Sequence, residues 1–234
     1  MHLDGCCVVP GAVPGVLCAK LAQCVDMMLA RLDPSDVDSF GSVRCRKHRY
    51  DLKLPMTCEV RSVLESVVCS LFPILEDRVT SEGRLVELSC LVTDSGAERQ
   101  PLHPDTDSTG SNTVFAPLVT VFLALQDVSP AMGPTVLCRG TNSHSWHEAL
   151  NRVPPDERSS DKVLQDFGGV EATCEIGTAV VMDSRLIHCG GANQGARRRL
   201  FYTTWQVPGN TPLGSTYSLR EEVRGYRLRD FCDQ

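Results

Sequence analysis

The feature that most limits the fold of this 234-residue chain is a change in the sequence pattern at residue 84. From there on, short β-branched and apolar runs alternate with Gly, Pro, Asn and Asp. The runs are RLVELSCLVT, TVFAPLVTVFLALQDV, PTVLCRG, GGVEATCEI, GTAVVMDSRLIHC and RRLFYTTWQV. Short strands separated by turn residues in this way are typical of a β-sandwich or jelly roll.

The residues before this change have a helical pattern. Residues 13–32 and 58–77 carry apolar side chains at helical spacing, and Pro34 and Pro73 predict where the two helices end. The segment 141–168, with its prolines and mixed charges, predicts an irregular excursion between strands. The expected fold class is α+β, mainly β: a double-stranded β-helix (jelly-roll) core with N-terminal helices packed against it.

The length and composition of the chain, with 42% hydrophobic residues, fit one domain with a substantial core. We predict a single domain over residues 1–234. It comprises a mainly helical part (1–83), the jelly-roll core (84–210) and a C-terminal tail (211–234) in which residues 216–232 form a last helix.

Charge and cysteine usage narrow the partners and the compartment. The net charge of −6 argues against non-specific binding of nucleic acid, which needs a basic surface. The twelve cysteines include no CxxC pair, so we expect free thiols and an intracellular, reducing compartment, either the cytoplasm or an organelle. The longest apolar run, 114–125, is too short to span a membrane. We expect a small-molecule substrate, and the oligomeric state is open.

The stretch PLHPDTDSTG (101–110) places a histidine and a carboxylate two residues apart, at His103 and Asp105. In an extended segment, residues i and i+2 point to the same side, so both can bind one metal ion if a third ligand joins them. His188, at the end of a later strand-like run, is the candidate. Two imidazoles and one carboxylate form the facial triad of non-haem iron(II) oxygenases. An isolated HxD also occurs in surface turns, so the assignment depends on the rest of the chain.

Eleven residues after His188, the chain has an arginine that could bind the carboxylate of a ligand. Arg199 opens the strand-like run RLFYTTWQV, where its guanidinium could bind a carboxylate through two parallel hydrogen bonds. Arg197 lies two residues earlier on the same expected side and is the alternative, whereas Arg198 is expected to face the other way.

Taken together, these pieces resemble the phytanoyl-CoA dioxygenase family of iron(II)/2-oxoglutarate oxygenases over residues 96–206. GAERQPLHPD looks like the entry of that family into its iron-binding strand, and VFLALQDVSPAMGPTVLCRGTN is similar to its central strands. GTAVVMDSRLIHCGGANQGARRRL resembles its distal-histidine strand, turn and cofactor arginine. One departure is Asn142, which stands where the family usually has a histidine that is not an iron ligand.

The resemblance implies iron(II) as the metal, with 2-oxoglutarate and dioxygen as cosubstrates. His103, Asp105 and His188 would bind the metal, and Arg199 the far carboxylate of 2-oxoglutarate. Thr135 and Gln100 would add hydrogen bonds near the cosubstrate. The implied reaction is hydroxylation of an unactivated C–H bond of a small organic or lipid-like substrate, with succinate and carbon dioxide as co-products. The retained carboxylate favours hydroxylation over halogenation, because halogenating relatives replace it with a small residue.

Several alternatives stay open at this stage. The substrate could instead be a protein side chain, or the chain could be a non-catalytic jelly roll that binds a metal or ligand. Phe122 matches an aromatic of the cosubstrate pocket but suits the core better. His144 and His147 have HxxH spacing, but we interpret them as loop residues because no third ligand accompanies them. Residues 49–56, RYDLKLPM, could line the substrate entrance, although a strand that packs its leucines is the simpler interpretation.

Overall fold

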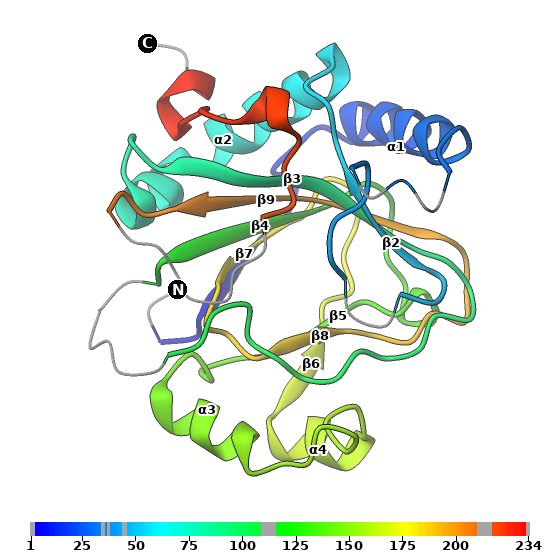
Figure 1. Ribbon diagram of the computed structural model, residues 1–234, viewed down its shortest axis with the longest axis vertical. Coiled ribbons are helices and arrows are strands. Elements are labelled where there is room, and N and C mark those ends of the chain that lie inside the picture. Colours follow the sequence, from blue (N-terminus) through cyan, green and yellow to red (C-terminus); the bar gives the residue numbers. More distant parts are fainter. Residues whose placement is uncertain are drawn as a thin grey trace.

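Two antiparallel sheets face each other in the computed structural model, which describes residues 3–33, 36, 38–43, 46–108, 116–209 and 217–232 (Figure 1). The main sheet has six strands in the order β1-β7-β4-β9-β3-β2, and the smaller sheet has three in the order β6-β5-β8. Because neighbouring strands come from distant parts of the chain, residues far apart in sequence meet between the sheets. The predicted jelly-roll fold is confirmed.

The strands fall where the β-branched runs predicted them, and two more come from the first part of the chain. The main sheet comprises β1 (Cys6–Val9), β2 (Arg49–Lys53), β3 (Arg84–Thr93), β4 (Leu118–Ala124), β7 (Ala179–Asp183) and β9 (Arg198–Gln206). The smaller sheet comprises β5 (Thr135–Cys138), β6 (Gly169–Glu171) and β8 (His188–Gly190). The run GTAVVMDSRLIHC thus divides into β7 and β8, which belong to different sheets.

Two long helices cover the outer face of the main sheet (Figure 1). They are α1 (Gly15–Leu29) and α2 (Cys58–Val79), and α2 begins at Thr57, whose hydroxyl accepts a hydrogen bond from the Val60 N–H. The apolar stripe of α2 packs on outward-facing strand residues such as Leu88 and Trp205 in the largest hydrophobic cluster. This cluster fixes the main sheet, whose inner face is then free to carry other side chains.

Two predictions for the part of the chain before the tail need correction. The second helix does not end at Pro73 but continues to Val79, because Leu75 and Val79 prolong its buried face. The segment 141–168 is not irregular: it contains α3 (His144–Asn151) and α4 (Asp161–Asp166), which cover the smaller sheet (Figure 1). Pro34 lies outside the described residues.

The described part of the tail forms two 3₁₀ turns rather than the predicted helix, η2 (Glu221–Val223) and η3 (Leu228–Phe231). A third 3₁₀ turn, η1 (Pro130–Met132), precedes β5. The tail turns bury Val223, Leu228 and Phe231 against the main cluster, so irregular backbone suffices to close the core here.

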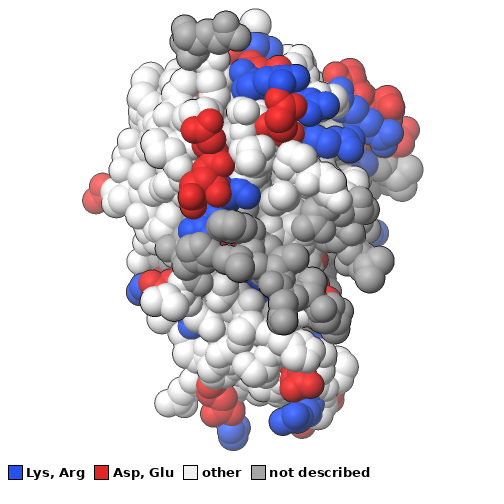
Figure 2. Space-filling view, turned by 90° about the vertical axis from the view of Figure 1, so that its left-hand side faces the viewer, with Lys and Arg blue, Asp and Glu red and all other residues white. Residues whose placement is uncertain are grey.

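On the face of the molecule drawn in Figure 2, Lys and Arg lie beside Asp and Glu, so this face does not carry charge of one sign. Several charged side chains of the protein form ion pairs, for example Arg227 and Arg229 with Glu82. Among the described residues, no helix combines the length and the apolar composition needed to cross a membrane.

Candidate active site

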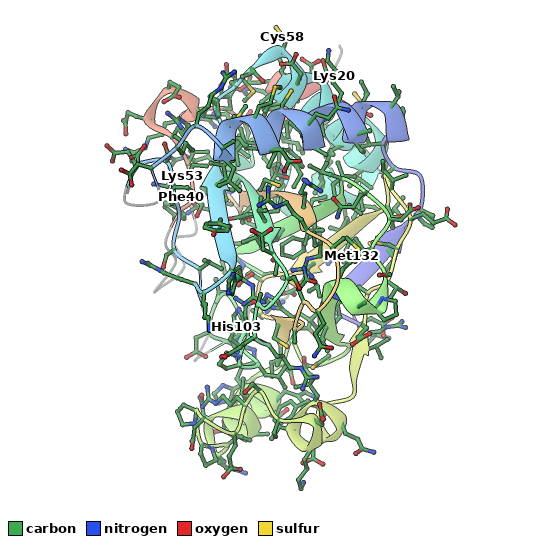
Figure 3. The ribbon with its side chains drawn as sticks, turned by 90° about the vertical axis from the view of Figure 1, so that its right-hand side faces the viewer. Lys20, Phe40, Lys53, Cys58, His103 and Met132 are labelled. Atoms are coloured by element: carbon green, nitrogen blue, oxygen red, sulfur yellow. The ribbon has the colours of Figure 1, made fainter. Side chains whose placement is uncertain are left out.

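A cavity of about 390 Å³ lies between the two sheets. The inner faces of β2, β3, β4 and β9 form one wall, and β5, β8 and the segment around His103 form the other. Figure 3 shows His103 below the main sheet, on the side of the molecule where β2 descends from Lys53. The residues that line the cavity therefore come from both halves of the chain.

His103, Asp105 and His188 meet at this cavity as predicted from their spacing. One potential ligand atom from each lies within 4.8 Å of the others. The backbone sets this geometry: His103 N–H donates to the His188 carbonyl at 3.0 Å and His188 N–H to the His103 carbonyl at 2.9 Å. The Asp105 N–H donates to the carbonyl of Ser184, in the turn between β7 and β8, at 2.9 Å.

A backbone carbonyl orients each of the two imidazoles through its Nδ1. The Nδ1 of His103 lies 2.8 Å from the Pro101 carbonyl, and the Nδ1 of His188 lies 3.0 Å from the Leu186 carbonyl. Because a carbonyl can only accept, each Nδ1 carries the proton and each Nε2 keeps a lone pair. The Nε2 of His188 is 3.6 Å from Asp105 Oδ1, near the separation of about 3 Å that neighbouring metal ligands have. The donor set and its orientation fit a facial iron(II) site.

One histidine of the HxxH pair, His147, supports the site indirectly. His147 is buried in α3, where its Nε2–H donates to the Arg185 carbonyl at 2.7 Å and its Nδ1 accepts the Ser108 N–H at 3.1 Å. It thereby holds the segment after Asp105 against the turn before His188. His144 is exposed. Among the described residues, neither belongs to a group that could hold a metal ion.

The departure at Asn142 also supports this turn rather than the cavity. Its side-chain amide donates to Asp183 Oδ2 at 3.2 Å, and Asp183 accepts a further hydrogen bond from Arg185 Nη2 at 2.6 Å. Asn142 is absent from the described lining of the cavity.

The three arginines at and just before the start of β9 face the opposite way from our prediction. Arg199 binds Asp26 of α1 through Nε and Nη2 at 2.8 and 2.6 Å, and Arg197 pairs with Asp94 and Asp26. Arg198 instead lines the cavity. The orientation predicted for this strand was wrong because its larger apolar side chains, Phe201 and Trp205, share the parity of Arg199 and pack under the helices.

Arg198 and Arg49 place two buried guanidinium groups at one end of the cavity, each with 2% of its surface exposed. Arg198 donates to the Gly133 carbonyl and to Thr93 Oγ1, and its Nε has no partner among the described residues. Burial, followed by repulsion from Arg49, lowers the pKa of Arg198 to about 10. Gly133 has φ +63°, and a Cβ there would lie 2.6 Å from the Ala192 backbone, so only glycine fits this support. This end of the cavity is suited to an anion.

Three further residues considered from the sequence also line the cavity. Thr135 and Gln100 both line it, and Gln100 Oε1 accepts the Gly190 N–H at 2.8 Å. Phe122 both lines the cavity and packs against Tyr202, with ring centroids 5.9 Å apart, so it combines the two roles considered for it. Whether these side chains contact a cosubstrate stays a prediction.

Two carboxyl groups at the cavity escaped the sequence analysis. Asp51 is buried on β2, and Tyr202 OH and Ser218 Oγ donate to it at 2.9 and 2.6 Å. Glu87 on β3 accepts a hydrogen bond from Thr204 Oγ1. Burial raises the pKa of Asp51, and that of Glu87 to about 8.

A sequence signal for Arg49 and Asp51 did exist in RYDLK. Polar residues alternate there with tyrosine and leucine, and the two leucines Leu52 and Leu54 are buried as expected. The opposite parity places Arg49 and Asp51 on the cavity wall. The pattern alone could not tell this inner face from a solvent-exposed one.

Comparison with known proteins agrees with the geometry. The sequence profile of the phytanoyl-CoA dioxygenase family matches residues 1–201. No curated protein matched the chain.

Several solved structures share the fold. HygX from Streptomyces hygroscopicus, crystallised with nickel, 2-oxoglutarate and hygromycin B, has a TM-score of 0.63 and 17% identity, and covers 98% of this chain and 96% of its own. EctD from S. alaskensis, with 2-oxoglutarate and 5-hydroxyectoine, has a TM-score of 0.65 and 15% identity, over 97% and 83%. The epimerase SnoN from nogalamycin biosynthesis has a TM-score of 0.64 and 17% identity, over 97% and 93%.

Proposed function

The chain belongs to the phytanoyl-CoA dioxygenase family, and from that premise we propose that it hydroxylates an unactivated C–H bond of a small organic or lipid-like molecule. The family is one of non-haem iron(II)/2-oxoglutarate-dependent oxygenases, so the protein is an enzyme of that class. Iron(II), 2-oxoglutarate and dioxygen are the cofactor and cosubstrates of the class. Succinate and carbon dioxide are the expected co-products.

The observation that carries the proposal is the convergence of His103, Asp105 and His188. The three residues would hold iron(II), with both Nε2 atoms and one carboxylate oxygen as ligands. When bound, the metal with 2-oxoglutarate and dioxygen supplies the oxidising chemistry, for which the protein provides binding and orientation. The Asp105 carboxylate supports hydroxylation rather than halogenation, because it leaves no position for a halide.

Arg198, in place of Arg199, would bind the far carboxylate of 2-oxoglutarate. Its guanidinium is buried at the cavity wall, has no acidic partner among the described residues, and lies near the second cation of Arg49. A buried cation without a counterion is unfavourable, and a carboxylate in this place would remove that cost through charge-assisted hydrogen bonds. Thr135 and Gln100 line the same cavity and would orient the same molecule.

The proposal is tested by 2-oxoglutarate turnover and by metal binding. We expect purified protein with iron(II) to convert 2-oxoglutarate to succinate in air. Under anaerobic conditions, iron(II) and 2-oxoglutarate together should produce the charge-transfer absorption of a chelated keto acid. His188→Ala should lose both signals, whereas His144→Ala should keep them, because His144 is an exposed histidine outside the cavity. Full turnover by His188→Ala would refute the triad assignment.

The type of reaction needs a separate measurement. The epimerase SnoN shares this fold, so the fold is compatible with outcomes other than hydroxylation. Mass spectrometry of an identified substrate decides the question: hydroxylation adds one oxygen atom, and epimerisation leaves the mass unchanged. An unchanged mass in a product formed together with succinate would contradict hydroxylation.

A further inference from the structure

We propose that the substrate carries a positively charged amine, and that the carboxyl group of Glu87 binds it at the end of the cavity remote from Arg49 and Arg198. This inference rests on the proposed function, because it assigns the remaining space of the same cavity to the substrate. It adds a substrate class and a specificity-determining residue, neither of which follows from the facial triad.

The strand register separates the two ends of the cavity. On the inner face of the main sheet, Glu87 of β3 pairs with Thr204 of β9, whereas Thr93 pairs with Arg198. Six residues of extended strand therefore separate Glu87 from the arginine row, which corresponds to roughly 20 Å. Thr120 of β4 pairs with Thr204 and continues the Glu87 row across the sheet.

The candidate metal ligands lie between these ends. The Ser184 N–H donates to the Leu118 carbonyl at 3.2 Å, which places the turn that holds Asp105 beside the Glu87 end of β4. Gly190 lies at the arginine end, because a Cβ there would be 3.4 Å from Arg49 Nη2. His188 falls between Ser184 and Gly190 along the chain. A cosubstrate that reaches from the histidines to Arg198 leaves the Glu87 side open for the substrate.

Within the described part of the chain, Glu87 is a carboxyl group without a cationic partner. Its hydrogen bond from Thr204 comes from a neutral hydroxyl, and among the described residues no Lys, Arg or His side chain lies within ion-pair distance of it. It lines the cavity, and its side chain is partly exposed to that space. A charged amine would supply the missing counterion through a charge-assisted hydrogen bond.

Asp51 strengthens this preference without binding the ligand itself. It is 1% exposed, and its two oxygens accept the hydroxyls of Tyr202 and Ser218. A Cβ on Gly41 would lie 1.9 Å from Asp51 Oδ2, so the backbone closes over the carboxyl group. Asp51 therefore acts as a fixed acidic neighbour that also orients the Tyr202 ring at the cavity wall.

The charges of the loaded site leave this acidic end uncompensated. Iron(II), Asp105 and the chelating carboxylate sum to about zero, and the far carboxylate of 2-oxoglutarate is matched by the arginines. Burial raises the pKa of Glu87 in the metal-free protein, so ionisation of this group is less favourable there than in water. A bound ammonium group would stabilise the ionised form. A neutral hydroxyl that binds the protonated acid is the competing case.

The test compares ligands that differ in one charge. We would measure dissociation constants by calorimetry for three pairs: cyclohexylamine and cyclohexanol, glucosamine and glucose, and tyramine and 2-(4-hydroxyphenyl)ethanol. The protein is used both metal-free and loaded with nickel(II) and 2-oxoglutarate, so that nothing turns over. We expect the amine to bind at least tenfold more tightly than its alcohol in one pair or more. Glu87→Gln should reduce that preference below threefold, and Glu171→Gln, which changes an exposed glutamate of β6, should retain it.

A crystal structure with the tightest amine gives a second measurement that needs no variant. The amine nitrogen should lie within hydrogen-bond distance of a Glu87 oxygen. Equal affinities within all three pairs, a preference that survives in Glu87→Gln, or a nitrogen bound elsewhere would each overturn the inference. Because none of these readouts requires turnover, the iron assignment is judged separately by succinate formation and by the charge-transfer absorption.

Discussion

The outer face of the main sheet buries apolar side chains, whereas the inner face combines apolar side chains with buried charged groups. On the outer face, Leu88, Phe201 and Trp205 join the largest hydrophobic cluster under α1 and α2. On the inner face, the same strands present Glu87 and Arg198 to the cavity. The outer face gains stability by removing apolar surface from water, whereas buried charge on the inner face costs stability. The difference indicates that the outer face stabilises the fold and that the charged groups of the inner face serve ligand binding.

The largest effect is expected on the affinity for 2-oxoglutarate when two neighbouring arginines on opposite faces of β9 are substituted in turn. Arg198→Gln should weaken binding of 2-oxoglutarate by at least about 30-fold, equivalent to roughly 2 kcal/mol, because it removes a buried cation from the proposed carboxylate site. Arg199→Gln should leave this affinity within about threefold, because Arg199 points to Asp26. Calorimetry with 2-oxoglutarate on the nickel(II)-loaded protein measures both. Equal losses in the two variants would contradict the assignment.

A substitution on the outer face should lower the unfolding free energy of the protein without changing its metal affinity. Leu88→Ala removes a fully buried side chain of the main cluster and should cost about 2–5 kcal/mol of unfolding free energy. Urea denaturation measures this cost. If the faces are as separate as proposed, the folded variant keeps the nickel(II) affinity of the parent chain. A large change in metal affinity with little loss of stability would break the comparison.

The buried carboxyl group of Glu87 on the inner face should make the stability of the protein depend on pH. Glu87 has an ordinary pKa of 4.5 but about 8 in the folded protein, so between these values the unfolded chain releases a proton that the folded chain retains. The stability of the metal-free protein should therefore fall as pH rises through this window. Glu87→Gln removes this contribution. The unfolding free energy of the variant, relative to that of the parent chain, should therefore be higher at pH 9 than at pH 5 by on the order of 1–3 kcal/mol. Denaturation curves at both pH values, with Glu171→Gln as the control, measure the effect, and a constant difference would contradict it.

The smallest effect on stability is expected for the ion pairs that join α1 to the outer face of the main sheet. Partial burial raises the pKa of Asp26, but Arg199 and Arg197 lower it by more, so the net value lies below the ordinary 3.8. The stabilisation is present above that value and is lost as pH falls below it. Asp26→Asn should cost about 1 kcal/mol or less at pH 7 and nothing near pH 2, because the ion pairs are partly exposed. Thermal denaturation at the two pH values checks this, and a cost that persists in acid would point to packing instead.

The sequence by itself determined the β-rich core, its strands from residue 84 onward and the three candidate metal ligands. Period-two runs and turn residues identify strands because strand geometry depends on local sequence, and the HxD spacing places His103 and Asp105 on one side for the same reason. Recognition of the family pattern supplied the cosubstrate.

The tertiary structure decided which of the two sets of alternate residues in each strand faces the cavity. Arg198 rather than Arg199 lines it, and Arg49, Asp51 and Glu87 become site residues, because α1 and α2 cover one face of the main sheet and leave the other to the cavity. A shift by one residue reverses every side chain of a strand, so alternation alone cannot identify the inner face. That choice is made by packing between segments far apart in the chain, and no local pattern contains it.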